Sequence, residues 1–169
     1  LDSLQPPIAG SGRGQSLRLE ELESLERDWM PLASAPLRFP AEPKVGVYRA
    51  TLDLMLDRDA PGSIRITLLQ DRIEAGRVTF GPGEVKVGDR NLAALEPGTW
   101  YHLDISGQFG AGSDRQLSIV MTAEDGRRWA TQVPYTKYQF DRPNDVQIIG
   151  LGAQGTAVQI DHLVVTVEE

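Results

Sequence analysis

The chain has 169 residues, with 24 acidic and 17 basic side chains, a net charge of −7 and no cysteine. That length suffices for one domain with a full core, and the acidic balance disfavours nucleic acid, whose phosphates need clustered Lys and Arg. Without cysteine there is no disulfide framework, thiolate metal site or cysteine nucleophile. No apolar run approaches the ~20 residues of a membrane-spanning helix, so no membrane span is expected.

The N-terminal part of the chain is the least regular. Residues 1–15 contain two prolines and three glycines and predict a loose lead-in at the surface. Apolar alternation over 16–20 predicts a short strand, and apolar residues near helical spacing over 22–29 predict a helical turn. Because proline cannot donate to a sheet ladder, the four prolines of 30–44 predict an irregular connection with no central strand.

Period-two alternation of apolar and polar side chains predicts β-strands through the rest of the chain. The clearest is VYRATLDLMLD at 47–57, in which the even positions are apolar and most odd positions are polar. One face of this strand is expected in the core and the other in water. Similar alternation predicts strands at 63–70, 77–80, 84–89, 99–106, 116–123, 127–133, 145–150 and 157–167. The short pair at 77–80 and 84–89 is interpreted as a small peripheral hairpin.

Two local signals refine this pattern. Glu124-Asp125-Gly126 predicts a tight turn that joins its flanking strands in a hairpin. In the last strand the apolar positions change phase near Asp161 and His162, which one extra residue in a β-bulge would explain. The alternating segments between Gly98 and Val167 indicate antiparallel strands in a sandwich. The sequence therefore predicts an all-β fold of two sheets.

Several stretches carry a resemblance to a known fold family. They are GQSLRLEE at 14–21, GVYRATLDLML at 46–56, PGTWYHLDISGQFG at 97–110, RQLSIVMTAEDGRRW at 115–129 and AVQIDHLVVTV at 157–167. In this order they resemble the concanavalin A-like (laminin G-like) jelly-roll domains of bacterial extracellular proteins. In that family the closing strand usually has Asn where His162 stands here. The resemblance implies one jelly-roll domain over 1–169, with two curved antiparallel sheets closed by pairing of the terminal strands.

The resemblance also sets the functional expectation. It implies a non-catalytic carbohydrate-binding or accessory module of a larger extracytoplasmic protein, whether secreted, periplasmic or at the cell surface. The start, LDSLQPP, has no signal-peptide pattern and fits a cut within a longer precursor. The expected partner is a polysaccharide or an adjacent domain of the parent protein. Fold alone does not determine function, so a purely structural or adhesive module stays open.

A glycan-cleaving enzyme of the same fold, a lyase or a hydrolase, is the other open alternative. Jelly-roll glycanases place their carboxylates on one strand as Glu-x-Asp-x-Glu, and the sequence has no such run. Asp57 and Asp59 stand where a strand enters a turn, and we expect them to be solvated turn acids. Lyases of this fold use Tyr with His or Lys, plus Arg and Gln. The chain has these residue types without the lyase motifs, so no catalytic residue is predicted.

Polar side chains on outward strand faces and aromatic residues at a loop rim are the candidates for binding sugar on the concave sheet. They are Arg49, Asp53, His102, Asp104, Tyr135, Tyr138 and Gln147. Because Pro134 ends the strand before them, we expect Tyr135 and Tyr138 to be exposed platforms. His102 is two residues from Asp104 on one strand face, where a carboxylate can orient an imidazole. An ordinary surface pair is the alternative.

Calcium is the one cofactor that the resemblance implies, as a structural ion held by loop oxygens. The candidate ligands are Asp141, Asn144 and Asp145 in the loop FDRPND, with Asp161 as a further candidate. Ca²⁺ requires six to eight oxygen ligands. Asx turns around Pro143 would explain the same loop without a metal. Two histidines without a zinc-site spacing disfavour zinc.

Overall fold

The computed structural model describes residues 4–5, 16–20, 32–36, 44–137, 139–140, 142–151 and 153–168. These residues form two antiparallel sheets and no helix, which confirms the predicted fold class. The seven-stranded sheet contains, in spatial order, β1 (Leu4–Gln5), β2 (Ser16–Glu20), β13 (Ala157–Glu168), β4 (Val45–Leu56), β9 (Trp100–Gly110), β10 (Gln116–Ala123) and β11 (Arg128–Pro134). The six-stranded sheet contains β3 (Leu32–Pro36), β12 (Asp145–Gly150), β5 (Ile64–Gln70), β6 (Ile73–Gly81), β7 (Glu84–Val87) and β8 (Arg90–Ala93).

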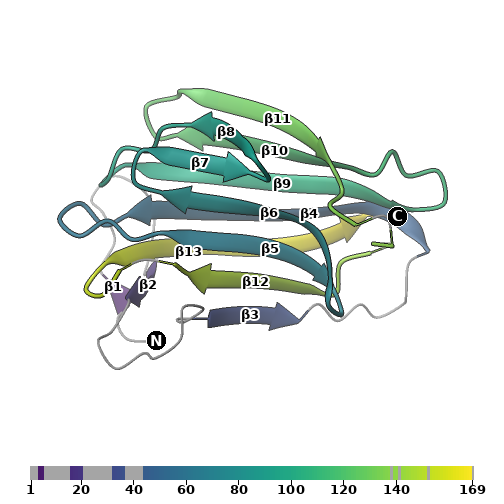
Figure 1. Ribbon diagram of the computed structural model, residues 1–169, viewed down its shortest axis with the longest axis horizontal. Coiled ribbons are helices and arrows are strands. Elements are labelled where there is room, and N and C mark those ends of the chain that lie inside the picture. The colour runs from purple at the N-terminus through teal and green to yellow at the C-terminus, as the bar shows by residue number, and fades with distance from the viewer. Residues whose placement is uncertain are drawn as a thin grey trace.

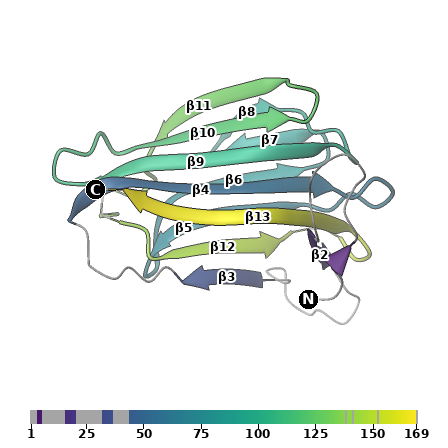
Figure 2. The ribbon, with the colours of Figure 1, turned by 180° about the vertical axis from the view of Figure 1, so that it is seen from behind.

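The two sheets lie face to face, with the six-stranded sheet toward the viewer in Figure 1 and the seven-stranded sheet toward the viewer in Figure 2. The core fills the space between them, as the alternation predicted. On β4 the inner positions are Tyr48, Ala50, Leu52, Leu54 and Leu56, and all are fully buried. The inner positions of β5, β9 and β10 are buried in the same way. Each strand therefore turns one face to the core and leaves the other for polar side chains.

The centre of the seven-stranded sheet is the long pairing of β4 with β9. Their register runs without interruption from Val45 opposite Gly110 to Met55 opposite Trp100. This pairing fixes which outward side chains of the two strands stand next to each other. β13 pairs with β4 on one side and with β2 on the other, so the pairing of strands from the two ends of the chain is confirmed.

The predicted bulge is confirmed near the middle of β13. The register of β13 against β4 shifts between Asp161 and Val164. His162 has a φ of 49° there, a left-handed conformation that residues other than glycine seldom adopt. The bulge changes which residues of β13 face the core, as the phase change in the sequence indicated.

Two expectations about the connections change. A strand, β3, forms inside the Pro-rich connection, but at the edge of its sheet, where proline is tolerated. The middle segments pair as the expected hairpin, β6 with β7, but this hairpin is not peripheral. β6 and β7 are interior strands of the six-stranded sheet and bury Val78, Phe80, Val85 and Val87. The helical turn predicted over 22–29 lies outside the described residues.

The expectation for Asp57 holds in part. It follows the end of β4, and its carboxylate accepts the amide N–H groups of Asp59 and Ala60, both at 3.1 Å, as a turn acid does. It is only partly solvated, because it also pairs with Arg18 of β2 and its side chain is partly buried. Burial alone would raise the pKa of Asp57, but the hydrogen bonds from Arg18, Ala60 and Asp59 outweigh it and hold this pKa below its ordinary value.

We predict that Leu52→Ala lowers the free energy of unfolding by about 2–5 kcal/mol, because Leu52 is 0% exposed and its removal leaves a cavity between the sheets. The matched control is Val164→Ala on β13, which is 51% exposed and should change the free energy by less than about 0.5 kcal/mol. Urea denaturation measures both. Equal effects of the two substitutions would contradict the described sandwich.

Candidate functional site

The outer face of the seven-stranded sheet carries the candidate site, and this face is turned to the viewer in Figure 2. Antiparallel pairing sets its outward side chains in rows across the strands. One row, here the serine row, consists of Arg49 on β4, Ser106 on β9, Ser118 on β10 and Gln132 on β11, each opposite the next. Neighbouring strands are ~4.8 Å apart. The row is thus a continuous polar band across four strands.

A second row lies four residues farther along β9, or ~13 Å at ~3.3 Å per residue. This histidine row consists of Asp161, Asp53, His102, Thr122 and Arg128, on β13, β4, β9, β10 and β11 in turn. Both rows belong to one face of one sheet. Four of the predicted sugar-binding residues, Arg49, Asp53, His102 and Asp104, are therefore brought together, as their alternation predicted.

The serine row contains a hollow of about 190 Å³. Its lining residues are Val47, Ser106, Gly107, Gln108, Asp114, Gln116, Ser118 and Gln132. The hollow follows from side-chain size, because two serines stand among three long glutamines. It is smaller than the ~300–1,000 Å³ pockets that enclose drug-sized ligands. Its size suits a ligand that is held from one side, along a sheet face.

The polar groups of the hollow are available for a ligand. Within the described part of the chain, no side-chain hydrogen bond engages Ser106, Ser118, Gln108, Gln116 or Gln132. A glutamine amide offers two donors and an acceptor, and a serine hydroxyl both donates and accepts. The hollow therefore presents hydrogen-bond donors and acceptors close together. Neutral hydroxyl groups can pair with both.

Tyr135 supports the hollow from inside the sandwich. It is 9% exposed, and its hydroxyl donates to the backbone carbonyl of Gln108. Its ring stacks against Tyr48 at a centroid separation of 6.5 Å and meets the edge of Phe140 at 5.0 Å. A Cβ at Gly107 would come within 2.5 Å of both tyrosine hydroxyls, so the sheet can lie on this cluster only where residue 107 has no side chain.

The expectation of an exposed Tyr135 is therefore wrong. Pro134 does end β11, but the chain turns inward after it instead of outward. Tyr138, the other predicted platform, lies outside the described residues. Gln147 is also displaced from the predicted group. It stands on β12 in the six-stranded sheet and donates to Asp145 at 3.1 Å.

Arg49 of the serine row forms an ion pair with Asp104. The guanidinium meets the carboxylate in three contacts, Nε to Oδ1 at 2.9 Å, Nε to Oδ2 at 3.0 Å and Nη2 to Oδ2 at 2.6 Å. The hydrogen bond and the charge of Asp104 raise the pKa of Arg49 above its ordinary value. The Asp104 that the sequence placed beside His102 thus pairs with Arg49 instead.

His102 and His162 share the carboxylate of Asp53. His102 Nδ1 lies 2.8 Å from Oδ1 and His162 Nδ1 lies 3.1 Å from Oδ2. Asp53 is only 8% exposed, whereas about half of each imidazole is open to solvent. An ionised carboxylate can only accept, so each Nδ1 must carry the hydrogen. Nε2 of each ring is then the atom left to accept a proton or a ligand hydrogen.

The bulge of β13 completes this cluster. Asp161 lies opposite Asp53, its Oδ1 accepts the backbone N–H of His162 at 2.8 Å, and its Oδ2 is 3.4 Å from His162 Nδ1. The left-handed backbone at His162 is what brings its side chain to Asp53. The phase change in the sequence located the bulge, but no pattern in the sequence indicated a role for His162. The contact of His162 with Asp53 depends on the register in which β13 pairs with β4, and the sequence alone does not show this register.

Of the predicted calcium ligands that the structure describes, Asp161 lies apart from Asn144 and Asp145. Asn144 exchanges two hydrogen bonds of 2.8 Å with Asp71, one to its backbone N–H and one to its carboxylate. Asp145 is on β12, whereas Asp161 is on β13 in the other sheet, and Asp141 lies outside the described residues. Among the residues that the structure describes, no group of three or more His, Cys, Asp or Glu side chains is arranged to hold a metal. A calcium ion stays a prediction.

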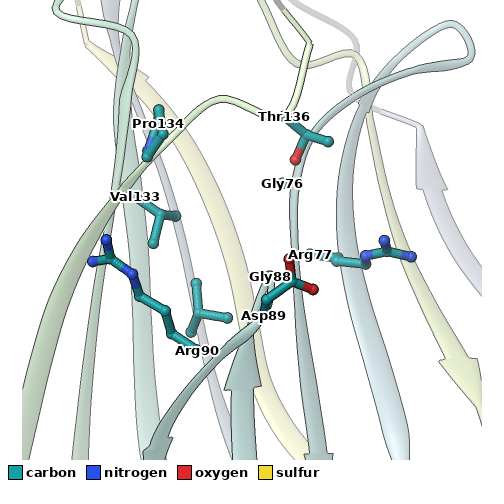
Figure 3. A pocket seen from close by; sticks show the side chains of 9 residues that line it. Gly76, Arg77, Gly88, Asp89, Arg90, Val133, Pro134 and Thr136 are labelled. Carbon is teal, nitrogen blue, oxygen red and sulfur yellow. The ribbon is translucent and has the colours of Figure 1, made fainter.

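A second pocket, of about 260 Å³, lies where the edge strands β8 and β11 of the two sheets approach each other. Its lining residues are Gly76, Arg77, Val87, Gly88, Asp89, Arg90, Val133, Pro134 and Thr136. Figure 3 shows the Thr136 hydroxyl pointing into this pocket and the Arg77 side chain extending away from it. None of the residues singled out from the sequence lines it.

We predict that neutral His102 and His162 carry their proton on Nδ1, because both Nδ1 atoms face the Asp53 carboxylate. Long-range ¹H–¹⁵N correlation spectra distinguish the two tautomers directly. In Asp53→Asn the constraint is weakened, since an amide presents a donor as well as an acceptor, and the tautomer ratio should shift toward Nε2–H. A dominant Nε2–H form in the unaltered protein would contradict the described cluster.

Comparison with known proteins supports the fold and leaves the activity open. No protein-family model matches the sequence, and no curated protein matches it. A marine alginate lyase (PL-14) from Aplysia kurodai matches the structure with a TM-score of 0.60 at 8% identity, over 98% of this chain and 87% of that chain. A lectin from Bauhinia forficata in complex with GalNAc has a TM-score of 0.55 at 10% identity, over 94% and 90% of the two chains. Peanut lectin has a TM-score of 0.53 at 10% identity, over 92% and 88%.

These similarities show that the chain has the jelly-roll fold of lectins and alginate lyases. At such low identity they carry nothing about a shared ligand. In addition, the described residues contain no helix of the length and apolar character that crossing a membrane requires. What the comparisons establish for this chain is its two-sheet jelly-roll architecture.

Proposed function

We propose that this chain is a carbohydrate-binding domain that holds its ligand on the outer face of the seven-stranded sheet. The observation that carries the proposal is the hollow of the serine row, with its unengaged glutamine and serine side chains. Such groups match the hydroxyl groups of a sugar, which both donate and accept hydrogen bonds. The geometry favours an extended ligand lying across β4, β9, β10 and β11, since the row runs in that direction.

The jelly-roll fold is compatible with a glycan ligand. Structures similar to this one include a lectin in complex with GalNAc and an alginate lyase, so the same architecture serves both to bind and to act on sugars. We further propose that the domain is a non-catalytic, accessory part of an extracytoplasmic protein. A polysaccharide or an adjacent domain of the same protein would then be its partner.

The first test is thermal unfolding in the presence of a panel of soluble polysaccharides, with and without Ca²⁺ or EDTA. A ligand at 100 times its dissociation constant that binds only the folded state adds about 2.7 kcal/mol, which shifts the melting temperature measurably. We expect stabilisation by at least one glycan. A purely structural module predicts no shift with any of them. A shift that EDTA abolishes would support the predicted calcium ion.

Substitutions in the hollow locate the binding. Removing one ligand hydrogen bond costs about 0.5–1.5 kcal/mol, so Gln132→Ala or Gln116→Ala should weaken binding roughly two- to tenfold. Ser118→Trp should abolish it by filling the hollow. The control is Arg90→Ala in the second pocket, with unchanged affinity expected. Isothermal titration measures each variant after its melting temperature is checked. Loss of affinity in the control alone would move the site away from the hollow.

Glycan cleavage is a second candidate function, favoured by one observation. Asp53 holds two imidazoles by Nδ1 and leaves both Nε2 atoms on the polar face. Positioned imidazoles of this kind serve as general base and general acid. In an elimination, one would take the proton beside a uronate carboxyl group as the glycosidic C–O bond breaks, while an acid protonates the leaving oxygen.

This second function has its own assay. Cleavage predicts the release of new reducing ends, or of unsaturated uronates, from a polysaccharide panel. His102→Ala should then lower the rate by roughly 10²–10⁴-fold, the usual contribution of a general acid or base. Gln147→Ala, in the other sheet, is the control. If the unaltered protein releases no product from any polymer, the cleavage function is excluded and the binding function is unaffected.

A further inference from the structure

We infer that the hollow of the serine row selects a neutral glycan and rejects polyuronates. The inference rests on the proposed carbohydrate binding and names the class of ligand. A protein of this fold that cleaves alginate needs a site that accepts a polyanion. The hollow of this chain would not be such a site. The observation that carries it is the distribution of charge on this face.

The hollow itself has no cation to meet a carboxylate. Of the eight residues that line it, Asp114 is the one charged residue, and it is acidic. Its Oδ1 accepts the backbone N–H of Gln116 at 3.0 Å, which holds the carboxylate at the start of β10. A uronate in the hollow would therefore meet a fixed like charge, and like-charge contacts of this kind suppress binding.

The cation of the serine row is already neutralised. Arg49, in the same row, is bound by the Asp104 carboxylate through two of its nitrogen atoms. The negative charge of Glu168, also near this guanidinium, adds to the rise in its pKa. Asp104 neutralises the charge of this guanidinium, so a uronate that approaches Arg49 gains less attraction than it would from an unpaired cation.

At the other end of the strands, one arginine is paired and the other lies far from the hollow. Arg18 of β2 is paired with Asp57 and, at 3.3 Å, with Glu20. Arg128 of β11 is the cation of the histidine row, and it lies four residues from Gln132, or ~13 Å along the strand. At that separation solvent and salt screen most of its attraction. The net charge of −7 further repels a polyanion as a whole.

A neutral glycan meets none of these costs. Its hydroxyl groups can donate to the Asp114 carboxylate and exchange hydrogen bonds with the glutamine amides and serine hydroxyls. An acidic residue in the hollow then becomes an acceptor for the ligand instead of an obstacle. Binding of this kind depends on hydrogen bonds more than on charge, so added salt should change it little.

The closing experiment compares polymers that differ only in charge. Polygalacturonate, alginate and glucuronoxylan are each tested beside the carboxyl-reduced form of the same preparation, in which the acid groups have become neutral primary alcohols. Neutral glucan, mannan and galactan complete the set. Affinity electrophoresis finds the polymers that bind, and titration calorimetry at low and high NaCl gives the dissociation constants.

We expect binding to be confined to neutral polymers, with any reduced form that binds doing so at least about tenfold more tightly than its acidic parent. Tighter binding of an acidic parent overturns the inference and leaves carbohydrate binding intact. Binding to no polymer of either kind removes the proposed function, and the inference with it. The two failures are thus distinguishable.

One substitution isolates the role of Asp114. Asp114→Asn keeps an oxygen that can accept the N–H of Gln116 but removes the charge. Affinity for the acidic member of a pair should rise at least about threefold, and the discrimination between the two members should fall. Asp59→Asn, which removes an acidic charge from a turn outside the hollow, is the control for net charge. Equal effects of both variants would mean that net charge, and not the hollow, sets the preference.

Discussion

The register of β4 against β9 is the constraint on which the rest of the structure depends. It runs unbroken from Val45 opposite Gly110 to Met55 opposite Trp100, in the middle of the larger sheet. A slip by one residue would turn the apolar face of one strand to water and its polar face into the core. Both rows of the candidate site are built on this pairing, because Arg49 meets Ser106 and Asp53 meets His102 through it. The pairing of β4 with β9 therefore determines both the core and the candidate site.

The bulge of β13 adds what regular pairing cannot supply. Strict alternation would carry the residue after Asp161 toward the core, whereas the left-handed turn at His162 brings its imidazole to Asp53. Asn is the residue that adopts this conformation most readily after glycine, and histidine is also enriched in it. The Asn that is usual at this point in the resembling domains thus has a backbone explanation. The same explanation covers His162, whose imidazole additionally reaches a carboxylate.

The sequence predicted the strands whose pattern is local and missed what depends on partners. Alternation alone placed Tyr48 and Leu52 inward and Arg49 and Asp53 outward. It could not show that Tyr135 turns under the sheet, because that depends on a space beside Gly107 that only the fold creates. Nor could it assign Gln147 to a sheet. The hollow went unnoticed for the same reason, since Ser106, Ser118 and Gln132 become neighbours only when register is known.

The pairing of charges on this face says more about the ligand that the face can bind than the fold does. Lectins and an alginate lyase share the architecture, so the two-sheet frame accepts both neutral and acidic ligands. What differs between such proteins must then lie in side chains of the open face. Here Asp104 holds Arg49 and Asp57 holds Arg18, while the glutamine and serine side chains of the hollow make no hydrogen bond within the described residues. A hollow whose neighbouring arginine is paired and whose amides and hydroxyls are open to a ligand is suited to form hydrogen bonds. It is not built to neutralise an anion.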